Sequence, residues 1–176
     1  MTNTMIPDLQ HVKLPGQIDC DSPFPAIFQA GAKLEQDMDL LAVWFRTHRQ
    51  AILDLLAQRG ALLLRGLPIH SDQDFDLVMR SLDQENFSYA GSLSNAVRHN
   101  RTERVFTANE APSDVEIYFH HEMAQTPVFP SKLAFYCEQA PTMGGSTPLC
   151  RSDALLSEMA EQIPEFVQRC DELGLR

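Results

Sequence analysis

The stretch "FHHEM", residues 119–123, contains the side chains best suited to metal chemistry. His120 and Glu122 are two residues apart. In an extended segment, side chains at positions i and i+2 project to the same side, so one metal ion can reach an imidazole nitrogen and a carboxylate oxygen. This pair suits ferrous iron held by two histidines and one carboxylate, a site that leaves three coordination positions open. His120 and Glu122 are therefore candidate metal ligands, and in a regular strand His121 would point to the opposite side.

The triplet is a weak signal by itself, because the chain contains a second one in residues 70–72, "HSD". There, Ser71 and Asp74 form a helix start signal, so we interpret His70 as a loop residue. The alternative for His120 and Glu122 is an ordinary polar pair at the end of a strand. Their context favours a site, since a proline-marked loop, an alternating strand and "GGSTP" follow them.

The first half of the chain has helical and strand signals in alternation. Apolar residues at steps of three and four predict a helix from about 33 to 58 that includes His48 at the edge of the core and ends at Gly60. The apolar run in residues 61–66 predicts a buried strand, and Ser71 is expected to cap a second helix. Residues 1–30, which contain four prolines, are predicted to be irregular.

The second half is predicted to be rich in β-structure. From residue 89 onward, "RVFTAN", "VEIYFHH" and "KLAFYCEQ" are short segments with many β-branched and aromatic residues. Ser152 is then expected to cap a helix that begins at Asp153, and Pro164 to lie in the first turn of another helix that runs toward Gly174. The predicted fold class is therefore α+β.

The composition is that of a globular protein with one domain over residues 1–176. The chain has 44% hydrophobic residues, a formal net charge of -10 and a sequence pI near 4.9. This charge argues against nucleic acid or an anionic membrane surface as partner. We find no apolar leader-like segment and no apolar run of the ~18 residues that a membrane span needs, so a cytoplasmic protein is expected.

Cysteine and arginine patterns add two weaker expectations. The four cysteines form no CxxC pair, which favours reduced thiols over a zinc or redox site. The arginine-rich stretch "RHNRTER", residues 98–104, is interpreted as a solvated loop, with contact to a substrate anion as the alternative.

Four segments occur in an order and spacing that resemble a known family. These are the HxE triplet, "FPSKLAFYC", "GGSTP" and "CRSDALL". They resemble the TauD/TfdA-like, or clavaminate synthase-like, family of Fe(II)- and 2-oxoglutarate-dependent dioxygenases. The segments "VFTANEAP", "HHEMAQ" and "FYCEQAP" are most similar to the branch related to the syringomycin-pathway (SyrP-like) hydroxylase.

The resemblance implies a fold, a reaction and roles for individual residues. The implied fold is part of a double-stranded β-helix, or jelly roll, with flanking N-terminal helices. His120 and Glu122 would be iron ligands, and Thr147 would help to hold 2-oxoglutarate, with an ordinary turn hydroxyl as the alternative for Thr147. The implied reaction uses O2 to hydroxylate an unactivated C–H bond of an amino acid, free or tethered to a carrier protein, in secondary metabolism, with a small sulfonate as the alternative substrate.

Two residues that the resemblance implies have no counterpart in the chain. The family's third iron ligand is a histidine far downstream, and an arginine beyond it pairs with 2-oxoglutarate. Only 54 residues follow Glu122, and none of them is a histidine. We therefore expect the N-terminal part of a longer enzyme, without the C-terminal half of the barrel.

Two alternatives remain at this point. One is a non-catalytic remnant or complementing chain that binds a partner through exposed β edges, and the other is a two-ligand metal-binding module. Substrate contacts could come from Glu110, Glu116 and Gln125, for which solvated polar residues are the alternative.

Overall fold

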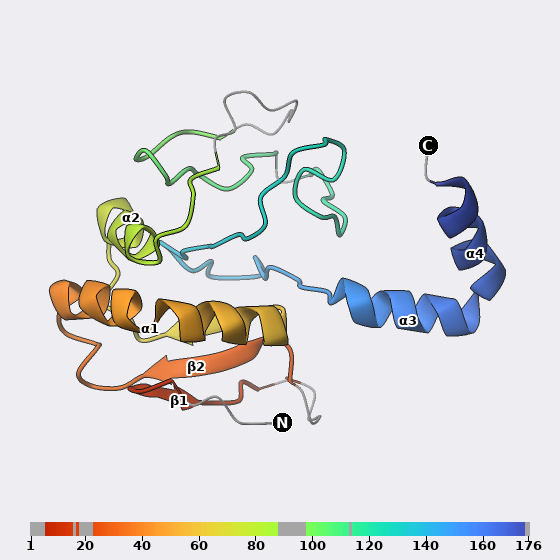
Figure 1. The fold of residues 1–176 in the computed structure, drawn as a ribbon. Coiled ribbons are helices and arrows are strands. Elements are labelled where there is room, and N and C mark those ends of the chain that lie inside the picture. Colours follow the sequence, from red (N-terminus) through yellow and green to blue (C-terminus); the bar gives the residue numbers. More distant parts are fainter. Residues whose placement is uncertain (1–5, 16, 18–22, 88–97, 113, 175–176) are drawn as a thin grey trace. The chain divides into compact units, whose positions relative to one another are not determined.

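The computed structural model describes residues 6–15, 17, 23–87, 98–112 and 114–174 of the chain (Figure 1). The protein consists of two compact units, Met1–Gly145 and Ser146–Arg176, and each is described by itself. The prediction of one domain over the whole length stays a prediction.

The first unit is built on a three-stranded sheet of order β1-β2-β3. Strand β1 (Leu9–His11) is antiparallel to the central strand β2 (Ala26–Ala30), and β3 (Leu62–Arg65) is parallel to β2. Four of the five residues of β2 are buried. The prediction of an irregular segment over residues 1–30 is therefore wrong for β1 and β2, because β2 takes its hydrogen bonds from partners on both sides, one of them more than thirty residues away.

Helix α1 (Met38–Arg59) connects the two parallel strands and lies along the sheet (Figure 1). It begins later than the sequence predicts, because the Asp37 carboxylate accepts hydrogen bonds from the backbone N–H groups of Asp39 and Leu40 at 2.8 and 3.0 Å. It ends as predicted at Gly60, which has a φ of 78°. Among the described residues, no helix has both the length and the apolar character needed to cross a membrane.

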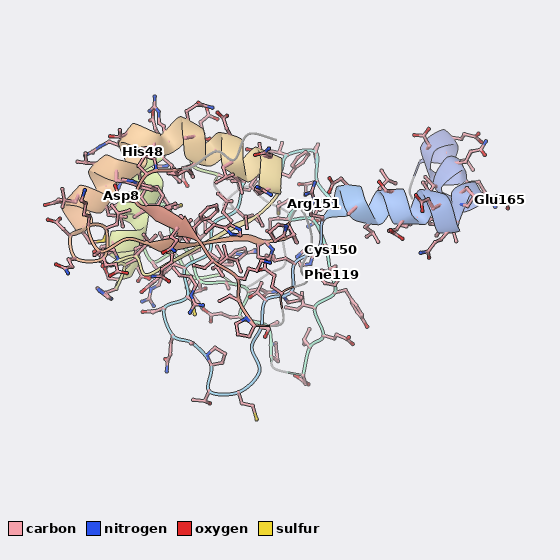
Figure 2. The ribbon with its side chains drawn as sticks, turned by 90° about the horizontal axis from the view of Figure 1, so that it is seen from below. Asp8, His48, Phe119, Cys150, Arg151 and Glu165 are labelled. Carbon is pink, nitrogen blue, oxygen red and sulfur yellow. The ribbon has the colours of Figure 1, made fainter. Side chains whose placement is uncertain are left out.

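The core lies between α1 and the sheet. Trp44 is 6% exposed, and its indole Nε1 donates a hydrogen bond to the Pro7 carbonyl at 3.1 Å. His48, labelled in Figure 2, lies one turn later with Nδ1 2.9 Å from the Trp44 carbonyl. The prediction of a half-buried histidine satisfied by a neighbour is confirmed. The buried core residues are Ile6, Ala26, Phe28, Ala30, Leu34, Leu41, Trp44, Phe45, Ile52, Leu55 and Val78.

Strand β3 and helix α2 (Asp72–Ser81) follow the predicted order. The Ser71 hydroxyl accepts a hydrogen bond from the backbone N–H of Asp74 at 3.2 Å, which confirms the cap. His70 is an exposed loop residue, as predicted. Strand β3 is less buried than predicted, since its residues alternate between half-buried and exposed.

The β-rich half that the sequence predicts is not formed by the described residues between 98 and 145. Their regular pairing is limited to one isolated antiparallel bridge between Asn100 and Phe106. A strand needs a neighbour for its backbone groups, and apart from the bridge at Phe106 the three predicted segments have no such neighbour within the described part of the chain. The jelly roll therefore remains an expectation, with which the small sheet and its helices are compatible.

The second unit consists mainly of two consecutive helices, α3 (Ser152–Gln162) and α4 (Pro164–Leu173). Ser152 is the first helical residue rather than the cap, because Arg151 occupies the N-cap position. The Arg151 guanidinium donates to the Asp153 carboxylate at 2.9 Å and lowers the pKa of that group to about 2. Helix α4 begins at Pro164 and is capped by Gly174, as predicted.

Candidate metal-binding site

The candidate ligands His120 and Glu122 lie where a segment without regular secondary structure enters a turn. The turn is held by hydrogen bonds from the Ala124 N–H to the His121 carbonyl at 3.2 Å and from the Thr126 N–H to the Met123 carbonyl at 3.0 Å. Met123 has a φ of 61° and is 4% exposed. A positive φ is costly for a residue with a long side chain, so burial of that side chain has to hold the turn in place.

His120 is exposed and its ring is oriented by the backbone. Its Nδ1 lies 2.8 Å from the carbonyl oxygen of Tyr118. A carbonyl oxygen can only accept a hydrogen bond, so Nδ1 must carry the proton in this contact. In the neutral ring, Nε2 then has the lone pair. This tautomer, with Nδ1 donating to a backbone carbonyl, is typical of histidines that bind metals through Nε2.

Glu122 is paired with an arginine from a distant part of the sequence. The Arg98 guanidinium Nη2 lies 3.0 Å from the Glu122 carboxylate Oε1, and the two side chains are 17% and 14% exposed. Because both charges are largely removed from water, each depends on its partner much more than in a surface ion pair.

The regular strand predicted to align His120 with Glu122 is not formed. His120 is exposed whereas Glu122 is half-buried at the start of the turn, and His121, the expected spacer, is exposed. The turn, rather than a β pleat, therefore places the Glu122 carboxylate.

The donor set fits part of a metal site. A neutral imidazole nitrogen and a carboxylate are the donor types expected for ferrous iron. Over the described ranges, no group of three or more His, Cys, Asp and Glu side chains is arranged to hold a metal ion. His120 and Glu122 therefore fit as two ligands, and a complete set requires donors in addition to them.

The glycine turn adopts the conformation that the sequence predicts. Gly144 and Gly145 have φ values of 69° and 68°, and a Cβ on Gly145 would lie 2.4 Å from Cγ of Pro141. Only glycine fits there without a shift. Thr147 is exposed and belongs to the second unit, so its role toward 2-oxoglutarate stays a prediction.

The arginine-rich stretch is bound to the rest of the first unit rather than simply solvated. Arg101 Nε donates to the Asp72 carboxylate at 2.7 Å at the start of α2, and this contact raises the pKa of Arg101. Arg98 contacts the candidate ligand Glu122, a partner that sequence analysis missed. The clustering of arginines was the available signal, but it did not identify the carboxylates opposite them.

Three further residues, Glu110, Glu116 and Gln125, are the candidates for contact with the substrate. Glu110 lies 3.5 Å from His99 Nε2, and Glu116 accepts a hydrogen bond from the Tyr118 hydroxyl at 3.1 Å. Gln125 is exposed. These contacts fit the interpretation of polar surface residues.

Comparisons with known proteins support the family resemblance. The family model "Taurine catabolism dioxygenase TauD, TfdA family" matches residues 22–173. A clavaminate synthase-like protein of Arabidopsis thaliana is 38% identical over 179 residues, which cover 99% of this chain and 52% of the relative. The dapdiamide synthesis protein DdaC of Enterobacter agglomerans is 35% identical over 117 residues, which cover 66% of this chain and 35% of that protein.

The chain thus spans about half the length of the Arabidopsis relative and about a third of the length of DdaC. The matched range includes both candidate ligands and the glycine turn. The chain belongs to the taurine catabolism dioxygenase TauD, TfdA family.

Proposed function

We propose that the chain provides the iron-binding residues His120 and Glu122 of an Fe(II)- and 2-oxoglutarate-dependent oxygenase. The observation that carries the proposal is the 2.8 Å contact between His120 Nδ1 and the Tyr118 carbonyl, which in the neutral ring leaves the Nε2 lone pair for a metal. Membership of the family supports the same chemistry. The relationship to the SyrP-like branch and the position of the chain within the N-terminal half of a longer enzyme belong to this proposal.

The proposed substrate is an amino acid, free or attached to a carrier protein, that is hydroxylated at an unactivated C–H bond. It rests on the resemblance of the "HHEMAQ" and "FYCEQAP" segments and on the similarity to a protein named for dapdiamide synthesis. Iron with 2-oxoglutarate supplies O2 activation and oxidation of the C–H bond, with succinate and CO2 as by-products.

The chain's own residues have three tasks in this chemistry. His120 donates its Nε2 lone pair, with the ring fixed by the Tyr118 carbonyl. Glu122 supplies a carboxylate whose place is fixed by the turn around the buried Met123. Thr147 is proposed to donate its hydroxyl to a carboxylate of 2-oxoglutarate, next to glycines that let the backbone approach closely.

Anaerobic titration of the full-length or reconstituted enzyme with Fe(II) and 2-oxoglutarate tests the ligand assignment. We expect a visible charge-transfer absorption that needs both additions and that disappears in His120→Ala. His70→Ala is the matched control, because His70 belongs to the other HxD/E triplet and should leave the absorption unchanged. An absorption that survives His120→Ala, or none in the unsubstituted protein, contradicts the proposal.

A second candidate function is that of a complementing chain that binds a β-rich partner. The observation that favours it is the exposure of large apolar side chains in the predicted strands. Phe119, labelled in Figure 2, is 68% exposed, and Phe135 is 70% exposed. Large apolar side chains exposed in segments with strand character are available to contact a partner.

Co-purification tests the second candidate, with the part of the Arabidopsis relative outside the match as the partner. We expect a complex with this chain and its loss in the double variant Phe119→Asn, Phe135→Asn. Leu156→Asn is the matched control, because Leu156 is 56% exposed but belongs to α3. Absence of a complex with the unsubstituted chain contradicts this candidate.

A further inference from the structure

The ion pair between Arg98 and Glu122 links two residues that are 24 positions apart in the sequence. The Nη2 to Oε1 distance is 3.0 Å, and the side chains are 17% and 14% exposed. By contrast, Arg101 in the same stretch is 45% exposed and pairs with Asp72 outside the candidate site. Arg98 is thus a shielded cation placed directly on a candidate metal ligand.

The residues that follow Arg98 keep it in this position. The backbone N–H of His99 donates to the Thr107 hydroxyl and the Thr107 N–H donates to the His99 carbonyl, both at 2.9 Å. The same loop is attached to α2, because the Thr102 hydroxyl donates to the carboxylate of Asp76, which is 6% exposed. Residues 99–107 are therefore attached to α2 through Thr102, and Arg98 directly precedes this attached loop.

From this geometry, and on the basis of the proposed function, we infer that Arg98 is a positioning residue that competes with the metal for Glu122. In the metal-free chain, the guanidinium neutralises the carboxylate and compensates for its removal from water. A divalent cation on Glu122 weakens this contact, because two cations near one carboxylate repel each other. Arg98 therefore lowers the affinity of the site for metal while it stabilises the metal-free fold.

A purely structural ion pair predicts the opposite effect on metal binding. If Arg98 only kept Glu122 in place, its loss would loosen the turn and weaken both the fold and metal binding. Competition predicts that the two properties change in opposite directions, which makes the ideas separable by measurement.

Mn(II) binding, measured from the loss of the EPR signal of the free ion, provides this test. We count only the binding that disappears in His120→Ala, because the acidic chain also attracts cations nonspecifically. Arg98→Gln is expected to lower the dissociation constant about tenfold, the order of one short-range charge interaction in a partly solvated site. The same variant is expected to lower the melting temperature of the metal-free protein.

Arg101→Gln is the matched control, since it removes the same charge from the same loop while its partner Asp72 is no candidate ligand. The Mn(II) dissociation constant of Arg101→Gln should stay close to that of the unsubstituted chain. If Arg98→Gln binds Mn(II) no more tightly than Arg101→Gln does, the inference is overturned, whereas the proposed function is not. Absence of His120-dependent binding also overturns the inference, whereas the proposed function is tested separately by the charge-transfer absorption of the full-length or reconstituted enzyme.

A second measurement observes Arg98 in the unsubstituted protein, so it does not depend on whether Arg98→Gln folds. In the unsubstituted protein, the Arg98 Nε–H NMR signal should shift on addition of Zn(II), while that of Arg101 should not. An Arg98 signal that stays unchanged when Zn(II) binds in a His120-dependent way overturns the inference.

Discussion

Residues 26–82 and residues 98–143 are both rich in apolar side chains, but they bury them to very different degrees. Leu41 in α1 is 0% exposed, whereas Phe135 in the second region is 70% exposed. Helices close their own backbone hydrogen bonds, so α1 and α2 form from local sequence and then cover the sheet. The second region consists of segments with strand character, which need neighbours that the described residues do not provide.

This comparison also explains how the candidate site is held. Residues 98–143 are attached to the helical region by a few polar contacts, among them Tyr136 Oη to the Ile69 carbonyl at 3.2 Å. The centroid of the Tyr136 ring lies 5.6 Å from the centroid of the Phe75 ring in α2. Burial raises the pKa of the Tyr136 hydroxyl. The site therefore depends on the first region for its placement and has little core of its own.

Substitution of one apolar residue in each region gives the largest expected contrast. Leu41→Ala should lower the free energy of unfolding by about 2–5 kcal/mol, because it leaves a cavity in the core. Phe135→Ala should change it by less than about 0.5 kcal/mol, as for an exposed residue. Urea unfolding followed by circular dichroism measures both. A cost for Phe135→Ala similar to that for Leu41→Ala would mean that the second region is buried in solution.

The attachment between the regions should give the next largest effect. Asp76 is 6% exposed, binds Arg80 Nη2 at 2.6 Å within α2 and accepts from the Thr102 hydroxyl at 3.0 Å. Asp76→Ala removes both contacts, and we expect a loss of about 1–3 kcal/mol in unfolding free energy. Hydrogen exchange should also become faster in residues 99–107.

Arg80→Gln is the control for this substitution, because Arg80 is 57% exposed and contacts Asp76 without reaching the loop. It should cost less than about 1 kcal/mol and leave exchange in residues 99–107 unchanged. If Arg80→Gln accelerates exchange in that loop as much as Asp76→Ala does, the contact to Thr102 is not the attachment.

The same difference between local and distant contacts decides what the sequence could predict. Helices α1, α2 and α4 were predicted from caps and periodicity that lie within a few residues. Strand β2 was missed because its stability comes from pairing with β1 and β3. The strands predicted after residue 89 have the right composition, but composition cannot supply a neighbouring strand.

The same difference between local and distant contacts applies to the candidate site. The residue types and spacing of His120 and Glu122 are visible in the sequence, and so is the glycine turn before Thr147. The contact between Arg98 and Glu122 spans 24 residues without any periodic pattern, so only the folded chain reveals it. Likewise, the tautomer of His120 depends on a backbone carbonyl whose position no sequence motif encodes.

The smallest expected effect concerns the N-terminus of α2, directly after the loop that carries His70. The Asp74 carboxylate accepts the backbone N–H of His70 at 3.0 Å, and this hydrogen bond, with one from Ser71, lowers the pKa of Asp74 below its ordinary value of 3.8. A depressed carboxyl pKa stabilises the fold above the unfolded-state pKa, and this stabilisation is lost as the pH falls through the folded-state pKa. Asp74→Asn should therefore reduce stability at pH 7 but have progressively less effect below about pH 4.

Thermal unfolding between pH 7 and pH 2.5 measures this difference, with Asp54→Asn as the control on the exposed surface of α1. The exposed Asp54 carboxylate accepts a hydrogen bond from the Gln50 side chain at 2.8 Å, one turn away, so its replacement should shift the curve little at any pH. A melting-temperature difference for Asp74→Asn that stays constant down to pH 2.5 would show that the carboxylate charge does not stabilise α2. A difference that closes below pH 4 would instead show that even this local cap contributes to the region on which the candidate site depends.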